Sequence, residues 1–73
     1  MNILNDLKNA KIIKGFKVIE SRLISLKGMV IITKNLGAVI VVNNTLADDL
    51  KTALAEDQIA KITKDYPEDS YTF

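Results

Sequence analysis

The sequence predicts a small α+β domain built on a three-stranded antiparallel sheet. Two runs of β-branched and aliphatic residues, 29–33 and 38–42, flank the short polar segment 34–37, which ends in glycine. Runs of this length and composition around such a connection are typical of two strands joined by a hairpin. Helical periodicity in the last third of the chain supplies the α part. We expect strands at about 16–26, 29–34 and 38–43, in the order of a meander.

Both apolar runs are hydrophobic at successive positions rather than at alternate ones. Val39 and Val41 would point to one face of a pleated strand. Ile40 and Val42 would point to the other, so both faces carry hydrocarbon. The helices of so short a chain can cover one face, and the second would be an exposed apolar patch. We therefore expect a homodimer that shares a face of the sheet, through these four residues, or its edge.

Residues 16–26 fit two patterns. The spacing of Phe16, Ile19 and Leu23 suits a helix, and the glycines at positions 15 and 28 bound the segment. The β-branched pair Val18 and Ile19 favours a strand, with a bulge near 20–21. Whether this segment is strand or helix stays open from the sequence, and we take the strand as the prediction.

Helices are expected at both ends of the chain. Near the start, Ile3, Leu7 and Ala10 fall on one helical stripe, which predicts a helix over 2–11. Towards the end, Leu46, Leu50 and Leu54 form one apolar stripe, and Ile59 and Ile62 start another in a different phase. We interpret the phase slip as a break, and expect two helices, 46–55 and 57–65. The domain would then span 1–66, followed by an acidic and aromatic tail over 67–73.

The composition disfavours catalysis and metal binding. The chain has no cysteine and no histidine, so the common zinc ligands and the ordinary activators of hydroxyl nucleophiles are missing. The acidic pairs at 48–49, 56–57 and 68–69 are sequence neighbours, which point apart by about 100° on a helix and share no ligand. We expect no enzyme activity, no cofactor and no metal. No apolar run is long enough to span a membrane, so a cytoplasmic protein without a membrane partner is expected.

Charge is distributed unevenly along the chain. Residues 1–45 carry seven basic and two acidic side chains, and residues 46–73 carry three basic and seven acidic ones, against a net charge of +1 overall. A basic half can bind nucleic acid through phosphate contacts or can bind an acidic protein. The basic surface would consist of Lys8, Lys11, Lys14, Lys17 and Arg22.

The C-terminal residues form the most suggestive short motif. The chain ends Glu68-Asp69-Ser70-Tyr71-Thr72-Phe73. This ending resembles the acidic, phenylalanine-terminated tail of bacterial single-stranded-DNA-binding proteins, which docks on other replication and repair proteins. The resemblance implies partner binding through Glu68, Asp69, Tyr71 and Phe73. The alternative is that the aromatic residues fold back and cover the sheet.

The chain as a whole resembles a class of proteins rather than one family. Its small size, its lack of cysteine and histidine, its opening Met1-Asn2-Ile3-Leu4 and its Lys/Asn/Ile-rich composition are similar to those of small phage-encoded inhibitors of host proteins. The resemblance implies a non-catalytic protein-binding module that blocks a larger host protein, such as a replication protein or a nuclease. The alternative is a small nucleic-acid-binding protein that uses the basic half.

Overall fold

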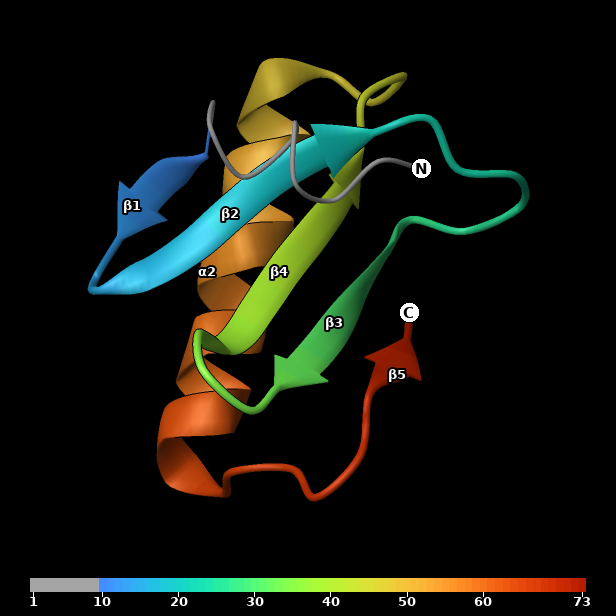
Figure 1. The fold of residues 1–73 in the computed structure, drawn as a ribbon. Coiled ribbons are helices and arrows are strands. Elements are labelled where there is room, and N and C mark those ends of the chain that lie inside the picture. The colour runs from blue at the N-terminus through green and yellow to red at the C-terminus, as the bar shows by residue number, and fades with distance from the viewer. Residues whose placement is uncertain (1–9) are drawn as a thin grey trace.

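The structure is a computed structural model, and it describes residues 10–73 (Figure 1). The expected helix over 2–11 lies outside the described residues except at its end, where Lys11 belongs to a strand instead. The elements in chain order are β1 (Lys11–Ile13), β2 (Phe16–Ser21), β3 (Gly28–Thr33), β4 (Gly37–Asn43), α2 (Asp48–Lys64) and β5 (Tyr71–Thr72).

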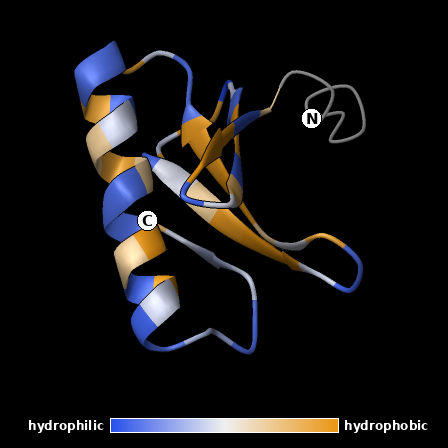
Figure 2. Cartoon of the chain, turned by 90° about the vertical axis from the view of Figure 1, so that its left-hand side faces the viewer, coloured by the Kyte–Doolittle hydropathy of each residue, from blue (hydrophilic) through white to orange (hydrophobic). Residues whose placement is uncertain are grey.

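The described residues form a five-stranded mixed sheet with one helix, so the expected three-stranded antiparallel sheet with three helices is wrong. The strand order is β1-β2-β4-β3-β5. The pair β2 and β4 runs parallel, whereas the β3–β4 hairpin is antiparallel as expected. The helix α2 lies along one face of the sheet as a second layer (Figure 2).

β4 lies at the centre of the sheet because it is the most apolar strand. Its residues from Ala38 to Asn43 are all buried. In the expected meander β4 would be an edge strand, with one row of backbone groups unpaired. Instead β2 pairs with one side of β4 and β3 with the other. The chain between β2 and β3 must therefore pass the end of β4.

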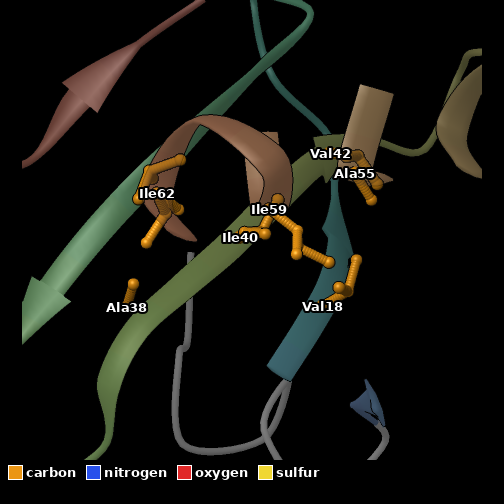
Figure 3. Close-up of a cluster of buried hydrophobic side chains, with 8 residues drawn as sticks. Val18, Ala38, Ile40, Val42, Ala55, Ile59 and Ile62 are labelled. Carbon is orange, nitrogen blue, oxygen red and sulfur yellow. The ribbon is translucent and has the colours of Figure 1, made fainter. Parts of the chain in front are cut away.

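Two apolar clusters lie on the two faces of the sheet. The cluster beneath α2 consists of Val18, Val30, Ala38, Ile40, Val42, Ala55, Ile59 and Ile62 (Figure 3). The cluster on the opposite face consists of Ile19, Val39 and Val41. The predicted alternation along β4 is confirmed.

The opposite face is not the open apolar patch that the sequence suggested. Val39 and Val41 are only 1% and 0% exposed. Met29 and Ile31 of β3 flank them, and Leu23 packs against the same cluster from the connection after β2. At the centre of the sheet, Val39 and Val41 are therefore buried rather than exposed, and so are Ile40 and Val42 beneath α2. The homodimer itself stays a prediction.

Residues 11–21 form a hairpin that the sequence pattern concealed. Lys14 and Gly15 have φ angles of 51° and 87°, the conformation of a two-residue hairpin turn in which both residues have positive φ. Lysine is uncommon at such a position, and no strand was expected before residue 16, so the hairpin was missed. β2 ends at Ser21, and the expected strand over 16–26 is too long by five residues, 22–26.

One continuous helix replaces the two helices expected at 46–55 and 57–65. Its buried residues are Ala55, Gln58, Ile59 and Ile62, while Leu50 is 43% exposed. The buried stripe includes a polar residue, Gln58, whose side-chain oxygen accepts a hydrogen bond from the Tyr71 hydroxyl. The apparent phase slip arose because Leu50 lies off the buried stripe, which instead contains the polar residue Gln58.

Candidate functional site

The connecting loop, residues 22–27 between β2 and β3, extends beyond the sheet at the right of Figure 1. Ile24 in this loop is 88% exposed, compared with 61% for Ile12, the next most exposed large apolar side chain of the described residues. Single exposed apolar residues are common on protein surfaces, so exposure alone does not indicate a binding site. The loop differs from other surface segments in how its backbone is held.

Asn43 at the end of β4 anchors the middle of the loop. Its side-chain amide donates hydrogen bonds to the carbonyl oxygens of Leu23, at 3.0 Å, and Leu26, at 2.9 Å. Its side-chain oxygen accepts hydrogen bonds from the backbone and the hydroxyl of Thr45, at 3.1 Å and 2.9 Å. Both donors and both acceptor positions of the buried amide are thus used. Asn43 therefore fixes the backbone on both sides of Ile24.

Further hydrogen bonds fix the two ends of the loop. The backbone N–H of Asn44 donates to the Ser21 carbonyl at 3.0 Å, and that of Asn43 donates to the Lys27 carbonyl at 2.9 Å. Within the loop, Ser25 has a φ of 61°. A non-glycine residue in this conformation costs on the order of 1 kcal/mol, and such residues cluster at functional sites. The loop is therefore a fixed structure that presents Ile24 to solvent.

Cationic side chains stand at both ends of the loop. Arg22 and Lys27 are exposed, and the segment 21–27 contains no carboxylate. The preceding acidic residue, Glu20, accepts a hydrogen bond and forms an ion pair with Lys51 of α2. The loop surface is thus an apolar tip between two positive charges.

A small charged cluster joins β2 to the start of α2. Lys51 binds Glu20 and also Asp48, whose carboxylate lies 3.0 Å from the Lys51 ammonium. The hydrogen bond to Glu20, with that to Asp48, raises the pKa of Lys51, and the bond to Lys51 lowers the pKa of Asp48. A lysine held as ammonium is no nucleophile. The adjoining cavity of about 50 Å³ is too small for a ligand of ordinary size.

An open groove of about 430 Å³ lies between the end of α2 and β5. Burial raises the pKa of Tyr71, which lines the groove, so its hydroxyl stays neutral; Lys61 opposes the shift and Asp57 adds to it. That hydroxyl donates to Gln58 at 2.6 Å and is already engaged. The groove is lined by Lys61, Ile62, Lys64, Asp65, Pro67 and Tyr71.

The C-terminal segment matches the alternative in which its aromatic residues cover the sheet. Tyr71 belongs to β5, which pairs with β3, and both Tyr71 and Phe73 pack against the cluster beneath α2. The Phe73 ring lies directly over Gly28. Glu68 and Asp69 are exposed. Two of the four residues expected to bind a partner are thus part of the domain's own packing.

The expected basic surface is divided between two faces of the hairpin. Cross-strand partners share a face, so Lys11 lies with Val18 on the α2 side, and Lys17 lies with Ile12 on the other. Lys14 occupies the hairpin turn and Arg22 the connecting loop, and Lys8 lies outside the described residues. Over residues 10–73, the geometry brings no single basic face together.

The residues of the candidate site that the sequence did not indicate are Ile24 and Asn43. Ile24 lay within the strand expected over 16–26, and Asn43 lay at the end of the strand expected over 38–43. Only the pairing of β2 with β4 reveals that the chain leaves the sheet at residue 22.

No family model matches this chain, and no curated protein or solved structure matches it either. Over residues 10–73, no group of three or more acidic side chains is placed to hold a metal ion. The helix in this part of the chain is not long and apolar enough to cross a membrane.

Proposed function

We propose that the protein is a non-catalytic protein-binding module and that the connecting loop is its contact surface. The observation that carries the proposal is Ile24, 88% exposed on a loop that the buried Asn43 holds at two carbonyl groups. Binding loops that are fixed before contact lose little conformational entropy on association. A single apolar anchor that enters a pocket can supply much of the free energy of binding.

The resemblance to small phage-encoded inhibitors extends this proposal. A module of this size that fills one pocket of a larger host protein would act by occupying that pocket. A cytoplasmic location belongs to the same proposal, because a chain without cysteine suits a reducing compartment. The homodimer stays a prediction, and sedimentation decides between the chain mass of 8.1 kDa and about twice that value.

Affinity capture with two matched variants tests the proposed function. Wild-type protein, Ile24→Ala and Leu36→Ala are immobilised separately and exposed to a bacterial lysate. Leu36 is the control because it is a 44% exposed apolar residue in the β3–β4 turn, away from the loop. We expect a protein that wild type and Leu36→Ala retain and Ile24→Ala retains at least roughly tenfold less. Equal retention by all three, or no retained protein, would contradict the proposal.

A further inference from the structure

We infer that the surface recognised by the connecting loop is an apolar pocket bordered by carboxylates on a folded protein. This inference rests on the proposed function and adds the chemistry of the partner. Its basis is the arrangement of one exposed aliphatic side chain, Ile24, between the exposed cations Arg22 and Lys27.

The depth of the pocket follows from the loop's own packing. Leu23 and Leu26 are half-buried, and their carbonyl oxygens are tied to Asn43. Among the apolar residues of the loop, only Ile24 projects into solvent. The partner's pocket therefore needs to hold a single apolar side chain. A flat apolar surface would need several exposed apolar residues side by side.

The charge of the pocket's border follows from the residues around the tip. Arg22 and Lys27 are not neutralised within the loop, because 21–27 contains no acidic residue. Glu20, the acid before the loop, is paired with Lys51. Complementary carboxylates on the partner would therefore speed association and exclude basic surfaces.

Nucleic acid and membranes fit this surface less well. The loop has no aromatic side chain on which a base could stack, and its most exposed apolar side chain, Ile24, offers no hydrogen bond to a phosphate. A membrane requires a broader apolar face than one isoleucine, because stable insertion depends on the apolar area that is buried. A protein pocket can enclose one side chain on all sides.

Charge reversal at the loop tests the inference. The probe is the lysate protein whose retention depends on Ile24, and a 20-nucleotide DNA duplex and vesicles containing one-third anionic lipid serve as competing probes. The baits are wild type, the double variant Arg22→Glu/Lys27→Glu, and the control Lys34→Glu, which changes an exposed lysine in the β3–β4 turn. We expect the double variant to retain roughly tenfold less of the protein and the control to retain as much as wild type.

The outcomes separate this inference from the function it rests on. If the double variant retains the Ile24-dependent protein as well as wild type does, the acidic border is wrong and the protein-binding function stands. If no lysate protein depends on Ile24, both fail. Binding of wild type to the duplex or to the vesicles that survives Ile24→Ala and is lost in the double variant would overturn the inference in favour of a nucleic acid or a membrane.

Discussion

Two neighbouring segments of this molecule place their apolar side chains in opposite directions. The C-terminal segment turns Tyr71 and Phe73 onto the cluster beneath α2. The connecting loop, joined to it by a 3.0 Å hydrogen bond from the Lys27 N–H to the Phe73 carbonyl, turns Ile24 to solvent. Hydropathy does not separate the two segments, since each carries large apolar residues next to charged ones.

The difference comes from what each backbone is bonded to. The C-terminal segment takes its register from β3, opposite Met29 and Val30, so alternate side chains must face the core. The middle of the loop has no strand beside it and is held there by the Asn43 side chain, which binds carbonyl groups and leaves the Ile24 side chain free to project. Backbone pairing, rather than composition, decides which apolar residues can meet a partner.

Gly28→Ala should have the largest effect on stability, because the added methyl group would collide with the Phe73 ring of the C-terminal segment. A Cβ atom at position 28 would lie 2.5 Å from the Phe73 ring and would also collide with the Val41 carbonyl. Overpacking of this kind costs about 3 kcal/mol. For a domain of this size, the melting temperature followed by circular dichroism should fall by roughly 12–24 °C.

Gly15→Ala is the matched control for that variant. A Cβ at position 15 would meet nothing within 4 Å, so its cost is limited to the strain of a φ of 87°. That strain is about 1 kcal/mol. If the two variants melted at the same temperature, close packing of Phe73 on Gly28 would be refuted.

Asn43→Ala should have an intermediate effect that is concentrated in the loop. It removes the donors to the carbonyl groups of Leu23 and Leu26 in a buried setting, which costs about 2 kcal/mol. Amide hydrogen exchange over 22–27 should accelerate more than exchange in β3 or α2. Asn44→Ala is the control, because the neighbouring residue holds the loop through its backbone. Unchanged exchange in the loop of Asn43→Ala would show that something else fixes it.

Tyr71→Phe should have a smaller effect than Gly28→Ala or Asn43→Ala. It leaves the Gln58 oxygen, on a residue only 2% exposed, without its donor, at a cost of about 1–2 kcal/mol. Because burial raises the pKa of Tyr71, the folded protein holds the phenolic proton more tightly than the unfolded chain does. The resulting stabilisation is complete below the unfolded pKa of about 10 and is lost as the pH rises through the folded value.

The difference between wild type and Tyr71→Phe should therefore shrink above about pH 10. The raised pKa of Lys51 makes both proteins lose stability in the same alkaline range, so only the difference between them reports on Tyr71. Urea unfolding of the two proteins at a series of pH values measures it. A constant difference across this range would contradict the role given to the Tyr71 hydroxyl.

The sequence was sufficient for the centre of the sheet and insufficient for its borders. The apolar runs predicted the β3–β4 hairpin and the alternation of Val39 and Ile40, because β-branched residues favour one local structure. The parallel pairing of β2 with β4 joins segments that lie 22 residues apart in the sequence, starting with Lys17 opposite Val39. It depends on whether β2 buries more surface beside β4 than beside β3. No local pattern encodes that choice.

Two other errors in the predicted fold came from polar residues, Gln58 and Lys14, at positions that only the tertiary structure makes favourable. Gln58 lies on the buried stripe of α2 because Tyr71 donates to it, and Tyr71 comes from a segment that looked like a tail. Lys14 sits in a left-handed turn because the hairpin requires it. The site shares this dependence: Ile24 is exposed because Asn43, 19 positions later, holds the backbone around it.

The central claim is that Ile24 contributes to partner binding and Phe73 to the stability of the fold. Measuring both the melting temperature and the captured protein for a variant at each position tests it. Ile24→Ala and Phe73→Ala are melted and used as baits side by side, well below both melting temperatures. We expect Ile24→Ala to melt within about 3 °C of wild type and to lose the retained protein. Phe73→Ala should melt roughly 10 °C lower and keep it. Loss of the retained protein by Phe73→Ala with retention by Ile24→Ala would contradict the claim and return partner binding to the C-terminal segment.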